Sequence, residues 1–466
     1  MIALPSVMFL LWYGPVVQFL FPLWNGRPLA LHAIALPSWA AILLLLAIWA
    51  VRSRRDFRGL SRYLNMSFAL LLVFPLVILL KPRDDVGYAR LPLETASVST
   101  TPASRPDIYF IILDKYTGSR SLAANFDYDN EPFEDSLRQR GFFVPERSRT
   151  NYVHTHLSLA SMLNWSHLQP VAEKMGSGSR DRSMTYGMIE DNRAWRFLKA
   201  QGYRFIFFPS AHSSTSRNDF ALRQIPEPSG ARIHLGVVWI AQTPFAPIVT
   251  WICMLLDCMD PNRRFPYQPE TAEDMESKFR HLMQQTRNPG PQFVLVHILL
   301  PHEPYIFNAD CTHRHPVWPA GGKKGQEAVV KQGHIAQIVC LNRVLLGIVD
   351  HLMTESATPP VIVLQSDHGH GRMVLDPATN KAIPGNELPD EKVFERVDIF
   401  AAYYLPNGGN EMLYDSITPV NVFPVILNHY FAAGIPLNED ATFWSDSWRP
   451  FRFRRVRLER TSNRHE

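Results

Sequence analysis

The hydrophobic pattern of the first 80 residues differs from that of the rest of the chain. Residues 2–24, 28–51 and 63–80 contain no Asp, Glu, Lys or Arg. A helix needs about 20 residues to cross the hydrocarbon of a bilayer. The pattern therefore predicts a membrane domain over residues 1–80 with three transmembrane helices. A signal peptide is the alternative for the first stretch, but no basic region precedes it and two more stretches follow.

The arginines of this region set its expected orientation. Five of them lie in the loop between the second and third stretches: Arg52, Arg54, Arg55, Arg58 and Arg62. Short loops rich in Arg and Lys stay in the cytoplasm. We therefore expect the chain after Leu80 to lie outside the cytoplasm. Residues 81–105 are expected to form a linker, since they end in a stretch rich in Ser, Thr and Pro without an apolar period.

A fourth uncharged stretch, residues 234–256, complicates this topology. It has the length of a membrane span, but Pro244 and Pro247 interrupt it. A crossing here would also divide the candidate site described below between two compartments. A buried or membrane-surface helical pair is therefore the preferred interpretation, with a fourth span as the alternative.

The pattern changes after residue 106 to short apolar runs that alternate with amphipathic stretches. The runs expected to be strands are 107–113, 204–208, 293–300, 361–364 and 399–405. The stretches expected to be helices are 132–140, 193–201, 271–287 and 334–353. Continuous apolar runs suit strands that are buried on both faces, and alternation with helices indicates a mostly parallel sheet. The sequence thus predicts an α/β domain over residues 106–448, with helices on both faces of the sheet.

The charges of the 466-residue chain are unevenly distributed. Its formal net charge is +4, but residues 1–80 carry +5 (six Arg, one Asp) and residues 449–466 carry +5 (seven Arg, two Glu), which leaves −6 for residues 81–448. This distribution excludes a uniformly basic nucleic-acid-binding protein. The basic end, 449–466, is expected to be a tail or an edge strand, and contact with anionic lipid is the alternative.

Four cysteines in an exported domain can pair. Cys311 and Cys340 flank a loop and a helix and form the candidate disulfide, which leaves Cys253 and Cys258. The connectivity does not follow from the sequence alone.

Three predicted strands are followed by side chains that can bind a metal ion. Asp114 follows the first strand, His302 follows the third, and Asp367 and His368 follow the fourth. Ligands of parallel sheets bind beyond the carboxyl ends of the strands. An Asp after a strand is by itself more often a helix cap. An adjacent carboxylate and imidazole on a tight turn is more specific, because both can face one cation.

A candidate nucleophile lies at the expected start of a helix over residues 155–163. Thr155 could simply cap this helix. The functional alternative is that the free N–H groups at the helix start favour an anionic phosphoryl group, and that a bound cation favours the alkoxide of Thr155.

These motifs together resemble the alkaline phosphatase/sulfatase superfamily. More narrowly, they resemble membrane-anchored members such as lipid A phosphoethanolamine transferases and lipoteichoic acid synthases. The stretch 155–162 (Thr-His-Leu-Ser-Leu-Ala-Ser-Met) fits the Thr-x-x-Ser-Leu-x-x-Met pattern of the transferases, and Pro-His-Glu-Pro around His302 is similar to their Ser/Pro-His-x-Pro motif.

The resemblance implies a site. It implies that Asp114, Thr155, Asp367 and His368 hold one divalent metal, zinc first and manganese second, that Thr155 is the nucleophile and that His302 lies near the transferred phosphate. It implies a metal-dependent transferase in a bacterial inner membrane, with an extracytoplasmic catalytic domain. The expected donor is a membrane phospholipid, and the expected acceptor is an envelope glycan or lipid. The alternatives are a sulfatase-like hydrolase, acting on phosphodiesters or sulfate esters, and a non-catalytic scaffold.

The chain also departs from these families. The transferases have Glu where this chain has Asp114, and the sulfatase motif Cys/Ser-x-Pro-x-Arg is absent. No Asp-x-x-x-His pair for a second zinc precedes Asp367. His370 replaces the Glu that follows Asp-His-Gly in the transferases, and it is expected either to assist the leaving group or to be a polar surface residue.

Other polar residues near the motifs have more ordinary interpretations. Lys115 is expected to be solvated rather than to bind phosphate. His154 and His156 flank Thr155, and at most one of them should face the site. His297 lies within an apolar strand and is expected to be a hydrogen-bonded core histidine rather than a ligand.

Overall fold

The computed structural model describes residues 105–225, 270–287, 290–318, 327–371 and 387–457, together with scattered helical positions between 35 and 66. The predicted membrane spans fall almost entirely outside the described residues, as do residues 234–256, Cys253 and Cys258, so these predictions remain untested. The chain divides into two compact units, and every element below belongs to the unit of residues 87–228 and 269–466.

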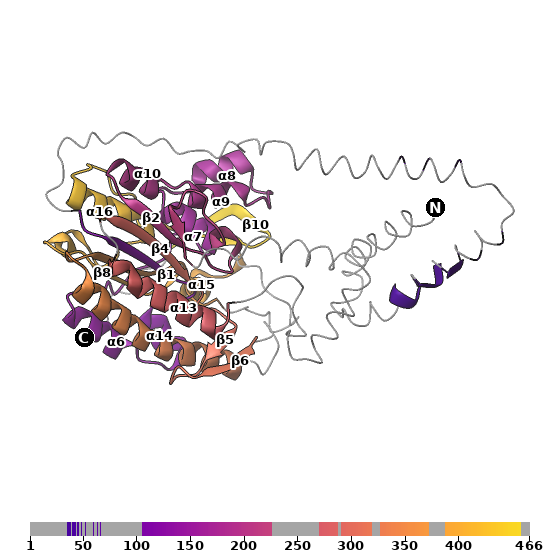
Figure 1. Cartoon of the computed structure of the whole chain (residues 1–466), viewed down its shortest axis with the longest axis horizontal. Helices are drawn as coiled ribbons and strands as arrows, with labels where there is room; N and C mark the ends of the chain where they lie inside the picture. The colour runs from indigo at the N-terminus through magenta and orange to yellow at the C-terminus, as the bar shows by residue number, and fades with distance from the viewer. Residues whose placement is uncertain are drawn as a thin grey trace. The chain divides into compact units, whose positions relative to one another are not determined.

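A six-stranded sheet in the order β3-β2-β4-β1-β7-β8 forms the centre of the unit (Figure 1). All neighbouring strands are parallel except β7 and β8. The strands are β1 (Ile108–Leu113), β2 (Arg204–Phe208), β3 (Arg223–Gln224), β4 (Gln292–Ile298), β7 (Val361–Ser366) and β8 (Ala401–Tyr404). This confirms the mostly parallel sheet. The predicted strand at 399–405 is the antiparallel exception at one edge.

Helices cover both faces of the sheet, as the alternation of strands and helices predicts. One face packs on α7 (Thr155–Met162), α9 (Ser183–Glu190), α10 (Arg193–Ala200) and α16 (Val422–Phe431), with α8 (Gln169–Met175) beside them. The other face packs on α5 (Ser119–Phe126), α6 (Glu131–Gln139), α13 (Ala272–Met283) and α14 (Glu327–Glu355). Figure 1 shows the two helical layers on opposite sides of the sheet.

Side-chain alternation decides which residues of a strand meet which layer. On β1, Phe110 and Ile112 join the α7 layer, whereas Tyr109 and Ile111 join the α14 layer. Both sets are fully buried, which is why the run reads as continuously apolar.

α14 is the one helix among the described residues that is long and apolar enough to cross a membrane. Its buried side chains, including Ile338, Leu341 and Leu345, instead pack within the core of the sheet domain. It is therefore a core helix of the α/β unit.

Smaller elements complete the unit. β5 (Tyr305–Phe307) and β6 (His313–Val317) form one hairpin, β9 (Thr442–Asp446) and β10 (Arg449–Val456) form another, and α15 (Asp390–Val397) precedes β8. The described part of the basic C-terminal segment is thus a hairpin strand and does not edge the main sheet.

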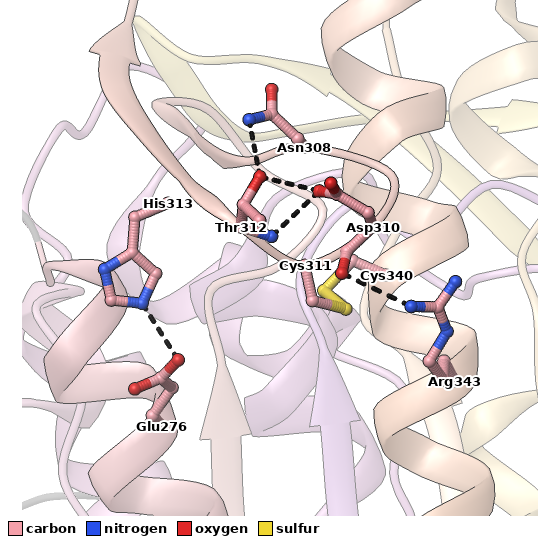
Figure 2. Close-up of a disulfide and its surroundings, with 8 residues drawn as sticks. All are labelled: Glu276, Asn308, Asp310, Cys311, Thr312, His313, Cys340 and Arg343. Atoms are coloured by element: carbon pink, nitrogen blue, oxygen red, sulfur yellow. Dashed lines mark hydrogen bonds and ion pairs between the residues drawn. A yellow bond between two sulfur atoms is a disulfide. The ribbon is translucent and has the colours of Figure 1, made fainter.

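The candidate disulfide is present. Cys311, in the β5–β6 turn, is bonded to Cys340 on α14 with their Cα atoms 5.0 Å apart (Figure 2). The bond ties the hairpin to the core helix.

Candidate metal centre

The carboxyl ends of three adjacent strands bring the polar candidates together. Leu113 of β1 pairs with Ser366 of β7, so that Asp114 and Asp367 are the next residues on neighbouring strands. Both carboxylates are buried. His368 follows on the same turn, and its Nε2 lies 3.4 Å from Asp367 Oδ2 and 3.9 Å from Asp114 Oδ1.

Glycine is needed in this turn because the chain passes close to the end of α15. A Cβ at Gly369 would lie 2.2 Å from the carbonyl oxygen of Glu395. A contact that short is repulsive, so a larger residue would displace the turn that carries Asp367 and His368. This explains the Asp-His-Gly sequence in terms of local packing.

Thr155 approaches the same point from α7. It is the first helical residue, and the N-cap residue, His154, makes no side-chain capping bond. Thr155 Oγ1 lies 3.2 Å from His368 Nε2. The hydroxyls of Thr150 and Ser158 both donate to the Asp367 carbonyl, which fixes the turn against the start of α7. The Ser158 hydroxyl is therefore engaged in a structural bond.

The structure thus places Asp114, Thr155, Asp367 and His368 side by side, although they lie far apart along the chain. The Thr155 hydroxyl does not cap its helix but faces the imidazole.

His297 joins this group, which the sequence interpretation did not expect. It is the penultimate residue of β4 and pairs with Ile112. Its Nδ1 lies 2.8 Å from the Thr215 hydroxyl, but its Nε2 lies 3.7 Å from Asp114 Oδ2. Ligand-type atoms of Asp114, His297 and Asp367 all lie within 4.8 Å of one another. The expectation of a satisfied core histidine is wrong, because Nε2 has no hydrogen-bond partner.

The unsatisfied atoms of this cluster fit a bound cation. Asp114 Oδ1, Asp367 Oδ2 and His297 Nε2 are all buried, and none has a hydrogen-bond partner among the described residues. Buried polar atoms are rarely left unsatisfied unless a water or an ion is missing. A set of oxygens with one or two imidazoles suits zinc or manganese better than calcium. The residues present therefore fit a divalent metal.

The protonation states support the same conclusion. Burial, followed by the neighbouring Asp367 carboxylate, raises the pKa of Asp114 well above its ordinary value. Burial raises the pKa of Asp367 to about 6, even though hydrogen bonds from the backbone N–H groups of Lys115 and His368 oppose the shift. Two buried carboxylates this close repel one another when both are ionised, and a dication between them would remove the repulsion.

His368 is a neutral imidazole whose Nε2 faces the cluster. Burial, and then the charge of Arg396, lowers the pKa of His368 well below its ordinary value. Its Nδ1 lies 3.1 Å from the Gly369 carbonyl, which can only accept, so the proton sits on Nδ1. Nε2 therefore presents a lone pair to the carboxylates and to Thr155. This second-sphere bond is the usual way in which a metal-binding histidine is oriented.

His302 lies beside the cluster rather than within it. Its side chain is about one-third exposed (33%), and its Nδ1 is hydrogen bonded to the carbonyl of Glu303. Burial and then the positive charge of Lys115 lower the pKa of His302 below its ordinary value. The buried Gln337 of α14 holds this loop by donating to the carbonyls of Pro301 and His302.

Lys115 is not the solvated side chain that we expected. Only 12% of it is exposed, and its Nζ lies 2.9 Å from the Glu303 carboxylate. Its backbone N–H donates to Asp367 Oδ1. Lys115 therefore connects the carboxylate pair to the loop that carries His302.

The remaining histidine candidates lie apart from the cluster. His154 bonds to the Ser445 carbonyl and His156 to the Thr185 hydroxyl, and neither belongs to the group of ligand-type atoms that Asp114, His297 and Asp367 form. His370 is buried, with Nδ1 2.9 Å from Glu395, and its ring packs edge-on against that of Phe126. The surface alternative for His370 is therefore wrong, and its role with the leaving group remains a prediction.

Comparison with known proteins finds solved structures that have a similar fold. No family model and no curated protein matches the chain. The zinc complex of the C-terminal periplasmic domain of EcEptC from Escherichia coli matches with a TM-score of 0.47 and 12% identity, over 77% of this chain and 94% of that one.

Two further solved structures are similar. The integral membrane lipooligosaccharide phosphoethanolamine transferase EptA from Neisseria meningitidis matches with a TM-score of 0.44 and 12% identity, over 86% of this chain and 69% of that one. A 2-O glycosaminoglycan sulfatase, BT1596, matches with a TM-score of 0.41 and 12% identity, over 72% of each. The structural neighbours of this chain are thus phosphoethanolamine transferases and sulfatases, the groups that its motifs resemble.

Proposed function

We propose that this protein is a metal-dependent transferase that moves a phospho-alcohol headgroup from a membrane phospholipid, through a phospho-threonine, to an envelope glycan or lipid. One observation carries the proposal. The Thr155 hydroxyl lies 3.2 Å from a neutral imidazole, within a buried cluster whose carboxylate oxygens lack partners. A scaffold would gain nothing from these unsatisfied atoms, which destabilise an empty site.

Asp114, Asp367, His368 and the Thr155 oxygen would hold the metal, with His297 as a fifth donor. The metal, zinc by preference, would supply positive charge that favours the Thr155 alkoxide and offsets charge on the phosphoryl oxygens.

Residues of the chain carry out the bond formation and the proton transfers. Thr155 Oγ forms a bond to phosphorus, and the bond from phosphorus to the lipid alcohol breaks. The proton that Thr155 loses ends on the departing alcohol. In the second step the acceptor hydroxyl attacks phosphorus, the bond to Thr155 breaks, and the proton of the acceptor ends on Thr155.

His302 would carry these protons once an anionic phosphoryl group beside it offsets the burial and the Lys115 charge that lower its pKa. Its Nδ1 proton is directed at the Glu303 carbonyl, so Nε2 presents a lone pair that can take a proton from the attacking hydroxyl. Once protonated, the ring also stabilises negative charge beside it. The sequence suggested only that His302 lies near the transferred phosphate.

The formed disulfide supports a catalytic unit outside the cytoplasm. Disulfides persist in the periplasm and on cell surfaces but are rare in the cytosol. Cys311–Cys340 is therefore consistent with a location on the extracytoplasmic side of a bacterial inner membrane, as a multi-pass protein.

The test is transfer from a labelled donor. Membranes that contain the full chain are supplied with phospholipid labelled in its headgroup phosphate, and glycans and lipids are then analysed for label. We expect label on an acceptor with the wild-type protein and none with Thr155→Val, which keeps the shape of the side chain but not its hydroxyl. Label found only in free phospho-alcohol would favour the hydrolase, and turnover by Thr155→Val would remove the proposed nucleophile.

A further inference from the structure

Arg396 occupies an unusual position between the nucleophile and the metal-binding turn. It lies in the last turn of α15, and its side chain is largely withdrawn from solvent. Its Nε and Nη2 donate to the Val153 carbonyl at 3.0 and 2.8 Å, and its Nη1 donates to the Gly369 carbonyl at 3.3 Å. Val153 precedes Thr155 by two residues and Gly369 directly follows His368, so one guanidinium joins both segments.

The same side chain competes for the metal-binding atom of His368. Arg396 Nη2 lies 3.2 Å from His368 Nε2. Since Nδ1 of His368 carries the proton, Nε2 is an acceptor, and it takes a hydrogen bond from Arg396. A metal needs that same lone pair, so metal binding would release an N–H of Arg396. The released N–H would remain beside Thr155, which is itself 3.2 Å from His368 Nε2.

Among the described residues, the charge of Arg396 also lacks a close counter-ion. In the described part of the chain its hydrogen-bond acceptors are two carbonyls and an imidazole, and it forms no ion pair. The carboxylates of Asp367, Asp114 and Glu303 act on it only from a longer range. A withdrawn charge without a partner destabilises the fold, and such a group is satisfied when an anion binds next to it.

We propose that Arg396 binds the non-bridging oxygens of the phosphoryl group. It would use the N–H of its own guanidinium that is freed from His368 when the metal binds. This rests on the proposed function and extends it by assigning the anion-binding residue. The planar guanidinium suits phosphate, because it can offer two N–H groups to two oxygens at once. The carbonyls of Val153 and Gly369 hold it in place, so little side-chain freedom is lost on binding.

The arrangement predicts opposite effects on two ligands. Removing the guanidinium should weaken phosphate binding, since a charge-assisted hydrogen bond is lost. It should also strengthen zinc binding, since His368 Nε2 loses a competing donor and a nearby positive charge disappears. A residue with a purely structural role would weaken both when it is removed.

The experiment measures zinc and inorganic phosphate binding to the purified full chain. The variants are Arg396→Met and, as one that keeps the charge but not the planar fork, Arg396→Lys. The control is Arg147→Met, which removes an exposed arginine paired with Asp415. Zinc affinity is measured by competition with a chelator, and phosphate affinity by calorimetry on the zinc-loaded proteins.

For Arg396→Met we expect phosphate binding to weaken roughly tenfold or more and zinc binding to become tighter. Arg396→Lys should fall between wild type and Arg396→Met for phosphate, and Arg147→Met should match wild type. Undiminished phosphate binding by Arg396→Met overturns this inference but leaves the proposed function standing. If zinc binding is lost in both variants of Arg396, the residue is a structural clamp and the inference is again wrong. A wild-type protein that binds neither zinc nor phosphate would overturn the proposed function as well.

Discussion

Asp114 and Asp367 lie buried on adjacent strands, and this pairing makes the metal-free site unstable. The raised pKa of Asp367, about 6, means that the folded protein holds a proton more tightly than the unfolded chain does. Stability contributed in this way is present at low pH and is lost as the pH rises through the folded-state pKa. The loss begins near the ordinary pKa of 3.8 and is complete above about 6.

Asp367→Asn should therefore stabilise the metal-free protein at neutral pH. The amide removes one charge but keeps an oxygen to accept the N–H groups of Lys115 and His368. At pH 7.5 with a chelator present, we expect a gain of about 2 kcal/mol, measured by thermal unfolding in detergent. The gain should shrink as the pH falls to 5. With zinc added, the order should reverse, because the variant loses a ligand; a variant less stable than wild type without metal would contradict this account.

His297 supplies a second prediction about single residues. If its unpartnered Nε2 faces the metal, His297→Gln should lower zinc affinity by at least about tenfold. His154→Gln is the matched control, because His154 directly precedes Thr155 in the chain but is bonded to the Ser445 carbonyl. Zinc retained during dialysis against a graded chelator gives the measurement. Equal zinc retention by both variants would mean that His297 is a core histidine and not a zinc ligand.

At the scale of elements, the sequence predicted those features that depend on one segment and on the residue directly after it. The β1, β4 and β7 runs and the residues that follow them were predictable, because a buried parallel strand reads as a continuous apolar run. His297 was missed although the signal was present. Phe293 and Leu295 share the face of β4 that packs on α7, and alternation by two places His297 on that same face. A polar residue at the end of this apolar face, on the strand beside the one that leads to Asp114, could have been recognised as a site candidate.

Contacts between distant segments could not be predicted in this way. Arg396 is one of many charged residues on an amphipathic helix, and nothing in α15 shows that its guanidinium reaches Val153 and Gly369. The Lys115–Glu303 pair joins residues that are 188 positions apart. Such contacts depend on how the loops meet above the sheet, which apolar periodicity does not encode.

α14 should affect activity through the loop that carries His302. Gln337 donates to the Pro301 and His302 carbonyls and accepts from the N–H of Ile306, all within the core. Gln337→Met keeps the volume but breaks all three bonds, and buried groups left unpaired cost about 1–3 kcal/mol each. We expect transfer activity to fall by about tenfold or more while zinc content is unchanged.

The control for this prediction is on the same helix. Arg343 bonds to the Asp310 carbonyl beside the disulfide (Figure 2), and its loss should leave activity near that of wild type. An equal fall in Arg343→Met would mean that α14 acts through general stability and not through Gln337. Loss of zinc from Gln337→Met would place the defect in the metal cluster instead.

At the scale of the whole molecule, the sheet restricts how the chain can cross a membrane. β2 and β3 precede residues 226–269, and β4 follows them. Arg204 to Phe208 of β2 pair directly with Gln292 to Val296 of β4. Neighbouring strands of one sheet share a compartment, so the chain between them crosses the bilayer an even number of times or not at all. This follows from the pairing alone, since residues 226–269 lie outside the described residues.

Reporter fusions test this constraint. Fusions after Leu80 and after Asp260 should both report an extracytoplasmic location, because the positive loop at 52–62 sets the first and the β2–β4 pairing sets the second. A cytoplasmic signal after Asp260 would make 234–256 a single span. Only the eleven residues 261–271 would then remain before α13, which packs on the sheet, to return across the bilayer. That is too short for a helix that crosses, which needs about 20 residues. Such a result would separate Asp114 and Thr155 from His297, Asp367 and His368, and the common metal centre would be impossible.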